Sequence, residues 1–389
     1  MTSARADAGL RVTLLGHSAG RRADGLSSYT EQVATGLQQR GCAVHLHHAA
    51  RDGLLVPVPR DQATSWPTVR FKTVTVPRPG FRRRMAAQIE TERPQVTHCS
   101  LSFTLADGWV GKLARERGSA TVATFHLPFG AEGSRRGMVM RQLHRFWLSR
   151  LGSYQRLVVF TEAHRQRLVQ LGASPERVVV IPNAVDCELF RPQEEDGRQA
   201  RLARGELVVG YLGRLDPEKG VEALLEGFSA APLPSAARLV VAGGGSLAQL
   251  VRRAAAKDPR VSYLGQLVGV AARARFWQEA DVFCLPSTAE GLSISLLEAM
   301  ASGCAVLATP EGGLEAAGPG GLALDPERLS GSVARELGRL AADPGLTASL
   351  GAAARQRALE RHGLGPMIDH LLAIYRDCMR ELATPPGRA

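Results

Sequence analysis

Short apolar segments alternate with helix-like segments along this chain, and the whole alternation occurs twice. In the first half, residues 11–15 and 121–125 are strand-like runs, each followed later by a segment of helical periodicity. Strands that alternate with helices form parallel sheets with crossover helices. A polar stretch at 191–205 interrupts the pattern, which restarts at Leu207. The sequence therefore predicts an α/β protein with two doubly wound, Rossmann-like domains.

These patterns also predict the boundaries of the domains. We expect a first domain at 1–186, a linker at 187–205 and a second domain at 206–365. Residues 366–389 are expected to form a helix that packs back on the first domain. Its apolar residues recur at helical spacing, namely Met367, Leu371, Ile374, Cys378 and Leu382. Ligands of open α/β sheets bind outside the carboxyl ends of the strands, so the site is expected in a cleft between the domains.

The composition narrows the class and location of the protein. Apolar residues make up 44% of the chain and charged residues 22%, which is the balance of a soluble globular protein. The first apolar run is broken by Arg11 and is too short for a signal peptide. The six cysteines are scattered without a C-x-x-C pair, which argues against a zinc site or a disulfide framework and favours the cytoplasm. Aromatic residues are only 5%, which argues against nucleic acid as a partner.

The net charge of +11 belongs entirely to the first half. Residues 1–190 hold 26 Lys and Arg against 14 Asp and Glu, which indicates an anionic partner for this half. Arginines cluster at 82–84 and along 134–151, where they are mixed with apolar residues. Two interpretations stay open for residues 134–151: a helix on an anionic membrane surface, which would place the protein peripherally on the inner face of the cell membrane, or a packed helix with a solvated face.

The segment 280–303 has the strongest chemical pattern. It comprises a buried strand, a loop that holds Glu290, and a helix that begins near Ser293 and contains Glu298. The free N–H groups of Gly291, Leu292 and Ser293 would form an anion site at the start of this helix. Two carboxylates beside an anion site suit sugar hydroxyls, which donate hydrogen bonds to them. Solvated glutamates at a helix start are the plainer alternative.

Two cations follow the first strand of the second half. Arg214 and Lys219 lie five residues apart around the predicted turn, so both can reach one diphosphate. An arginine could be an ordinary surface charge in a chain with 44 of them, but Lys219 is one of only four lysines.

Together these motifs resemble the family 4 (group 1) retaining glycosyltransferases, whose GT-B fold has two facing Rossmann-like domains. The Glu290-x7-Glu298 spacing is similar to the family signature, and residues 178–186 (V-V-V-I-P-N-A-V-D) resemble its interdomain I-P-N-G-V-D. Further similar motifs are Gly213-Arg214-Leu215, Glu218-Lys219-Gly220, Gly243-Gly244-Gly245 and Gly312-Gly313-Leu314-Glu315. The resemblance extends over nearly the whole chain.

The resemblance implies roles for individual residues. Arg214, Lys219 and the helix start at Leu292 and Ser293 would stabilise the leaving diphosphate. Glu298 would hold the ribose hydroxyls and Glu290 the hydroxyls of the donor sugar. His126 matches a family histidine near the reacting carbon, and Gly25 stands where the loop backbone approaches the donor phosphate, although Asp24 replaces the first glycine of the usual pair. His98, at another predicted strand end, is a weaker candidate for the acceptor site.

The resemblance also implies the reaction, which is transfer of a hexose from a nucleotide sugar with retention of configuration. UDP-glucose or a close relative is the expected donor, and a hydroxyl of a membrane lipid or glycolipid is the expected acceptor. The alternative is a soluble metabolite or saccharide acceptor, or GDP-mannose as the donor. No D-x-D pair occurs in the chain, so we expect no catalytic metal and no cofactor.

Two hypotheses from other classes stay open at this point. A nicotinamide-dependent oxidoreductase would share the fold, but the first strand is not followed by G-x-G-x-x-G. A non-catalytic binding protein with a decayed transferase fold would not need to keep Glu290, Glu298, Arg214 and Lys219 together. The sequence does not indicate the oligomeric state.

Overall fold

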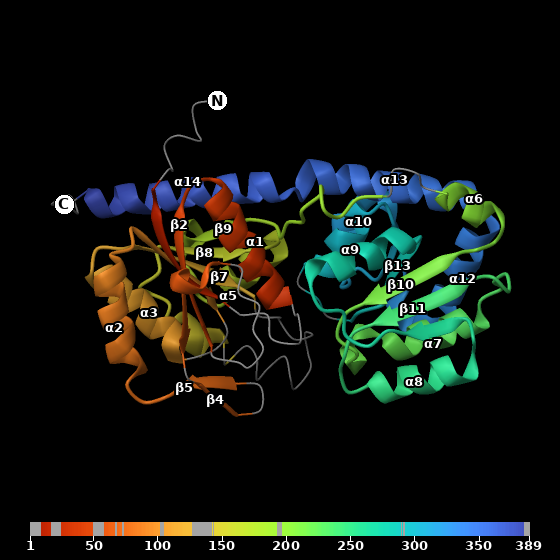
Figure 1. The fold of residues 1–389 in the computed structure, drawn as a ribbon, viewed down its shortest axis with the longest axis horizontal. Helices are drawn as coiled ribbons and strands as arrows, with labels where there is room; N and C mark the ends of the chain where they lie inside the picture. Colours follow the sequence, from red (N-terminus) through yellow and green to blue (C-terminus); the bar gives the residue numbers. More distant parts are fainter. Residues whose placement is uncertain are drawn as a thin grey trace. The chain divides into compact units, whose positions relative to one another are not determined.

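The computed structural model describes residues 9–16, 25–49, 58–66, 68–71, 74–101, 105–126, 142, 144–192, 197–288, 290 and 292–384. The chain divides into two compact units. Unit 1 consists of Met1–Pro182 together with Gly365–Ala389, and unit 2 of Asn183–Leu364. Each unit is an α/β structure with its own parallel sheet, which confirms the predicted fold class (Figure 1).

Unit 1 is organised around a sheet of seven parallel strands in the order β3-β2-β1-β6-β7-β8-β9. These are β1 (Arg11–Gly16), β2 (Ala43–Ala49), β3 (Ala63–Trp66), β6 (Val96–Leu101), β7 (Ala120–Phe125), β8 (Arg156–Val159) and β9 (Val178–Val180). Every residue of β6 and β7 is buried, as expected where helices cover both faces of a parallel sheet. A separate antiparallel hairpin, β4 (Thr68–Phe71) and β5 (Val74–Pro77), has no counterpart in the sequence-based prediction.

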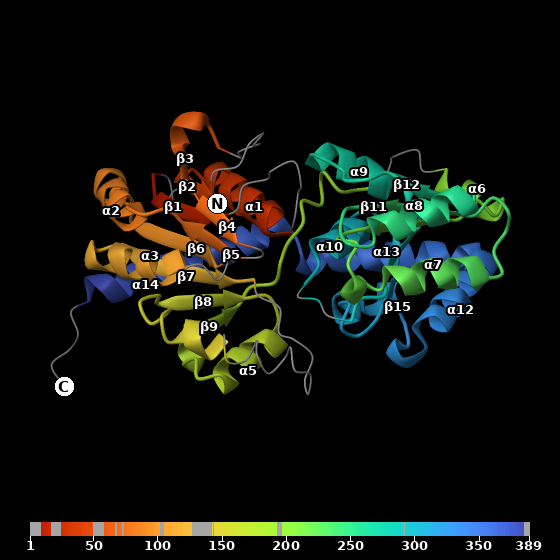
Figure 2. The same cartoon turned by 90° about the horizontal axis from the view of Figure 1, so that it is seen from below.

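The helices of unit 1 include α1 (Gly25–Gln39), α2 (Phe81–Glu92), α3 (Leu105–Glu116), α5 (Glu162–Gln170) and α14 (Leu364–Ala383). Along α14, the prediction is right for three core residues, Met367, Leu371 and Cys378. Ile374 and Leu382 are only partly buried, and the buried face includes Ile368, Leu372 and Tyr375 instead. The Gln155 amide donates to the Cys378 carbonyl at 2.8 Å, which fixes α14 within unit 1 (Figure 2).

The start of α1 differs from the prediction. In the sequence, Ser27 or Ser28 followed by Glu31 has the pattern of a capping box and predicts a helix that begins after the serine, but α1 begins at Gly25. Ser27 and Ser28 therefore lie inside the helix, where both are buried. A serine within the first turns cannot cap the helix that contains it, so the capping prediction is wrong.

Unit 2 is organised around six parallel strands in the order β12-β11-β10-β13-β14-β15. They are β10 (Val208–Leu212), β11 (Arg238–Ala242), β12 (Val261–Tyr263), β13 (Val282–Leu285), β14 (Ala305–Ala308) and β15 (Gly321–Ala323). The helices are α6 (Arg198–Ala203), α7 (Val221–Ala230), α8 (Ala248–Lys257), α9 (Val270–Glu279), α10 (Ile294–Ala301), α11 (Leu314–Ala317), α12 (Leu329–Ala342) and α13 (Pro344–Arg361). Parallel strands bring the loops after β10, β13 and β14 to the same edge of the sheet.

The expected linker at 187–205 is more structured than its composition indicates. It contains α6, whose Arg198 donates to the Gly303 carbonyl at 2.7 Å and forms an ion pair with Asp281. The division between the units falls after Pro182, because Val185 exchanges backbone hydrogen bonds with His362 and Leu364 of unit 2. Buried arginine contacts, which polar composition alone does not reveal, hold this segment on unit 2.

Candidate functional site

Two loops at the carboxyl edge of the unit 2 sheet are fastened to each other. The first, after β10, contains the short 3-10 turn Pro217–Lys219, and the second follows β13. The Thr288 backbone N–H donates to the Glu218 carbonyl at 2.9 Å. Gly220 has φ +68°, and a Cβ there would lie 2.0 Å from the Pro286 carbonyl oxygen. The close approach thus requires glycine after Lys219, as the Glu218-Lys219-Gly220 motif supplies.

Lys219 and Glu290 form the central contact of this site. Their Nζ and Oε1 atoms are 2.6 Å apart, and both side chains are largely covered. A lysine and a glutamate that share a partly buried position gain from the pairing and lose if either partner is removed alone. The structure thus brings together the lysine and the loop glutamate that the sequence places 71 positions apart.

Arg214 lies in the same loop but is more open. Its guanidinium pairs with Asp216 and, at 3.1 Å, with Glu218, while just over half of its side chain is exposed. Asp216 also accepts hydrogen bonds from the backbone and hydroxyl of Ser246, both at 3.0 Å. Arg214 is therefore held by acidic neighbours at the carboxyl end of β10, with its guanidinium accessible to a ligand.

The start of α10 is shaped by its own cap. The Ser293 hydroxyl accepts from the Leu296 backbone N–H, which satisfies one of the free donors of the first turn. The Leu292 carbonyl accepts from the Asn183 amide at 2.9 Å. Asn183 is the asparagine of the I-P-N motif, so that motif positions the loop before α10. Gly291, a predicted anion-site residue, lies outside the described residues.

Glu298 occupies the second turn of α10 and is 1% exposed. Its Oε1 accepts from Arg273 Nε at 2.9 Å and its Oε2 from the Trp277 indole at 3.2 Å. Both partners come from α9, and sequence analysis missed both. Arg273 could not be distinguished among many arginines, although an arginine flanked by buried apolar positions of one helix is an unusual pattern that could have been noticed.

The unit 1 candidates lie at the carboxyl ends of its strands. His126 directly follows β7, and its Nε2 lies 2.7 Å from the Ser100 hydroxyl. Its ring contacts Tyr29 edge-on, with ring centroids 4.7 Å apart. Gly25 is the first residue of α1. The structure thus holds the half-buried His126 ring against the Ser100 hydroxyl and the rings of Tyr29 and Phe160.

His98 does not belong to a site, and that weaker prediction is wrong. It lies inside β6 and is completely buried. Its Nδ1 lies 2.5 Å from the Tyr375 hydroxyl and its Nε2 2.7 Å from the Thr124 hydroxyl. Burial lowers the pKa of His98 to about 3, so its ring is neutral. Both ring nitrogens have protein partners, which leaves no atom for an acceptor.

One cluster among the described residues has the composition of a metal site. The ring nitrogens of His45 and His47 and a Glu92 oxygen lie within 4.8 Å of one another. However, His47 Nδ1 accepts from the Trp66 indole at 2.9 Å, so its Nε2 carries the proton and donates to Glu92 at 2.9 Å. A protonated Nε2 has no lone pair for a cation, so the contacts describe a hydrogen-bond network and not a set of metal ligands.

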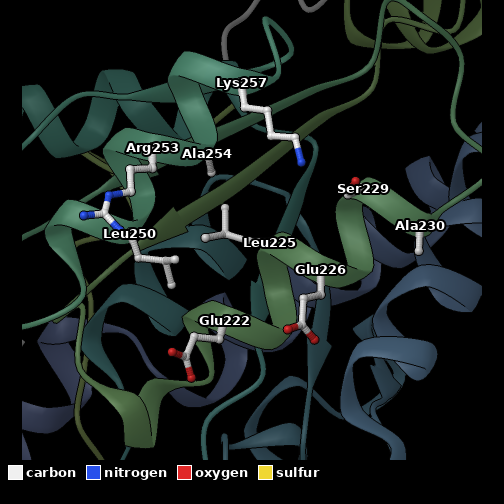
Figure 3. A pocket seen from close by; sticks show the side chains of 9 residues that line it. All are labelled: Glu222, Leu225, Glu226, Ser229, Ala230, Leu250, Arg253, Ala254 and Lys257. Atoms are coloured by element: carbon white, nitrogen blue, oxygen red, sulfur yellow. The ribbon is translucent and has the colours of Figure 1, made fainter.

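A surface groove of about 610 Å³ runs between α7 and α8 (Figure 3). Acidic side chains on α7 and basic side chains on α8 form its walls over a floor of leucine and alanine, and none of the predicted site residues lines it.

In unit 1 a second hollow, of about 730 Å³, has a basic and aromatic lining that includes Arg78, Arg82, Arg83 and Trp109. Half of the predicted basic helix at 134–151 lies outside the described residues. In the other half, residues 142 and 144–148 are helical, whereas 149–151 are not. No helix in the described part of the chain combines the length and apolar character needed to cross a bilayer.

Comparison with known families agrees with this architecture. Residues 23–189 match the family described as "Glycosyltransferase Family 4", and residues 206–343 match "Glycosyl transferases group 1". Together the two matches cover most of both units. The chain belongs to the group 1, family 4 glycosyltransferases.

Relatives within this family carry a specific name. The "D-inositol 3-phosphate glycosyltransferase" of Acidothermus cellulolyticus is 33% identical over 255 residues, which are 59% of this chain and 54% of the relative. The protein of the same name from Rhodococcus opacus is 31% identical over 297 residues, or 69% of this chain and 65% of the relative. The match thus spans just over half of the first of these relatives and about two thirds of the second.

Solved structures of other proteins have the same fold. Sucrose-phosphate synthase from Thermosynechococcus elongatus aligns with a TM-score of 0.76 at 21% identity, over 95% of this chain and 99% of that one. Anabaena HepE in complex with UDP and glucose aligns with a TM-score of 0.73 at 16% identity, over 95% of this chain and all of the other. At these identities the likeness establishes the GT-B fold alone.

Proposed function

We propose that this protein transfers a hexose from a nucleotide sugar, UDP-glucose or a close relative, to a hydroxyl group of a soluble acceptor. The observation that carries the proposal is the Lys219–Glu290 pair at the carboxyl edge of the unit 2 sheet, next to the start of α10. A cation and a carboxylate in one partly buried position offer complementary groups to a sugar diphosphate. Membership of the family supplies the reaction type.

The leaving diphosphate is held by Lys219, Arg214 and the start of α10 at Leu292 and Ser293. Charge develops on the diphosphate as the glycosidic bond breaks, and donors that are already positioned stabilise that charge without reorganisation. Lys219 is paired with Glu290 before any ligand binds. Phosphate oxygens compete for the Lys219 ammonium group, which releases the Glu290 carboxylate to accept hydrogen bonds from the sugar hydroxyls.

Glu298 belongs to the ribose end of the same site. Its carboxylate is oriented by two donors from α9, so it is fixed before the nucleotide arrives. In unit 1, His126 and Gly25 are the residues that we assign to the reaction. We assign His126 a role in orienting the reacting groups or relaying a proton, since its ring has a fixed orientation and a polar partner.

A soluble acceptor is better supported than the membrane lipid that the sequence analysis favours. The relatives in Acidothermus cellulolyticus and Rhodococcus opacus are named for D-inositol 3-phosphate, which is small and polar. An anionic acceptor also agrees with the excess of basic residues in the first half of the chain. We therefore adopt the alternative, with an inositol phosphate as the first acceptor to test.

The test begins with nucleotide binding. Addition of UDP should raise the unfolding temperature of the protein, and UDP-glucose or another UDP-hexose incubated with D-inositol 3-phosphate should yield a glycoside. The anomeric configuration of the product, read by NMR, should equal that of the donor. An inverted product, or no stabilisation by any of UDP, GDP and ADP, would contradict the proposal.

One observation keeps the lipid acceptor as a second candidate. The unit 1 hollow combines the exposed Trp109 with Arg78, Arg82 and Arg83, and no described carboxylate pairs with these three arginines. Aromatic and basic groups together suit the surface of an anionic membrane. Co-sedimentation with vesicles that contain anionic phospholipid, compared between the unmodified protein and an Arg82→Glu/Arg83→Glu variant, tests this candidate. Equal and salt-insensitive recovery of both proteins would exclude it.

A further inference from the structure

Arg273 occupies an unusual position for a charged residue. It lies in the first turn of α9 and is 8% exposed, and its neighbours Ala274, Phe276 and Trp277 on the same helix are also buried. Placing a guanidinium among apolar groups costs free energy unless its hydrogen bonds are satisfied. The sequence motifs that indicate the donor site do not include this residue.

The guanidinium is anchored at one atom only. Arg273 Nε donates to Glu298 at 2.9 Å, and this is the one hydrogen bond of the Arg273 side chain to another described residue. Arginine has four further N–H donors on its two terminal amino groups. The Arg273 side chain is 10% exposed and that of Glu298 is 1% exposed, so the surface that remains at this ion pair belongs to the arginine.

The carboxylate of Glu298 differs from the Arg273 guanidinium in the number of its partners. This carboxylate is covered and accepts from both Arg273 and Trp277. At this end of the site, the unused hydrogen-bonding capacity therefore belongs to Arg273. Since α9 and α10 both begin at the carboxyl edge of the sheet, Arg273 in the first turn of α9 lies on the side of unit 2 where ligands of such sheets bind.

We infer that Arg273 is a nucleotide-binding residue of the donor site: Glu298, itself fixed by Trp277, orients the guanidinium, and its two amino groups donate to acceptor oxygens on the nucleoside part of the donor. The inference rests on the proposed function and adds a specificity-determining residue to it. A planar fork with one anchored nitrogen presents two parallel donors, a geometry that a lysine ammonium group cannot reproduce.

The experiment compares variants that keep a donor for Glu298. Arg273→Lys and Arg273→Gln can both still hydrogen-bond that carboxylate, so the fold is preserved, but neither offers the fork. Calorimetric titration with UDP should show at least about 10-fold weaker binding for both, with unfolding temperatures close to that of the unmodified protein. Arg275→Lys, an exposed arginine on the same helix, is the matched control and should bind UDP within twofold of the unmodified protein.

Steady-state kinetics separates binding from a structural effect. We expect the donor KM to rise about as much as the UDP affinity falls, with kcat changed less than about threefold. Unchanged UDP affinity in Arg273→Lys or Arg273→Gln would overturn the inference and leave Arg273 as the counter-ion of a buried glutamate. If the unmodified protein binds UDP and Lys219→Ala weakens that binding, such a result leaves the proposed function intact. If the unmodified protein binds none of UDP, GDP and ADP, the proposed function itself fails.

Discussion

The polar contacts around the predicted site residues differ in kind between the two units. In unit 2 they are charged and paired with one another, as Lys219 is with Glu290 and Arg273 with Glu298. In unit 1 they form a neutral network, in which His98 joins the Tyr375 and Thr124 hydroxyls and Thr124 contacts Tyr29 at 2.8 Å. Unit 2 thus presents charges that a phosphate or sugar can rearrange, whereas this part of unit 1 is a fixed scaffold.

The net charges of the two halves of the chain show the opposite contrast. The excess of basic residues lies in the first half of the chain, while the second half is nearly balanced. Local pairing, and not overall charge, therefore distinguishes the proposed donor site. An anionic donor is bound by a few positioned cations, whereas a general positive charge attracts anions without orienting them.

The first prediction removes the cation of the unit 2 pair. Lys219→Ala should reduce turnover by about 10²-fold or more, because a charge-assisted contact to the leaving group contributes roughly 2–4 kcal/mol to the transition state. Lys257→Ala is the matched control, since this lysine lies on α8 and lines the groove away from the site. Steady-state rates of both variants test the comparison, and near-normal turnover of Lys219→Ala would remove that residue from the site.

The second prediction separates the two histidines of unit 1. His98→Ala should lower the free energy of unfolding by about 2–4 kcal/mol, because it leaves a cavity and takes one hydrogen-bond partner from each of two buried hydroxyls. His126→Ala should change stability by less than about 1 kcal/mol but lower turnover by at least about 10-fold. Urea unfolding and rate measurements on both variants check this assignment. The opposite pattern would exchange the two roles.

These two histidines also show where sequence reasoning stops. Both follow short apolar runs, so both looked like residues at strand ends. The structure extends β6 to Leu101, which puts His98 inside the strand, whereas β7 ends at Phe125 and leaves His126 beyond it. Strand length depends on pairing with neighbouring strands, which a single sequence does not contain.

In unit 2 the sequence indicates the candidate residues but not the contacts that they make. The turn residues and the Glu-x7-Glu spacing predicted the loops that carry Lys219 and Glu290. The contact between these side chains depends on the approach of Gly220 to Pro286, which is a property of the tertiary fold. The buried partners of Glu298 come from a different helix and left no motif, because hydrogen bonds between helices have no fixed spacing in sequence.

The third prediction uses the neutral state of His98. Its pKa is about 3 in the folded protein, below the ordinary value of 6.5, so between these values the unfolded chain binds more protons. The stability that His98 contributes is therefore complete above pH 6.5 and is lost as the pH falls, by up to about 1.4 kcal/mol per pH unit. Urea midpoints at pH 7 and pH 5 should differ less in His98→Gln than in the unmodified protein. An equal difference in both proteins would show that other groups cause the acid sensitivity.

The last prediction concerns a treatment that should have almost no effect. The chain has no D-x-D pair, and we assign the positive field at the diphosphate to Lys219, Arg214 and the start of α10. Sugar transfer should therefore proceed within about twofold of its normal rate after dialysis against EDTA. Since Lys219→Ala removes part of that field, added magnesium could restore some activity to this variant but should not stimulate the unmodified protein. Loss of transfer on chelation, with recovery on adding magnesium, would mean that a metal ion shares the work assigned to these cations and would weaken the contrast between the two units.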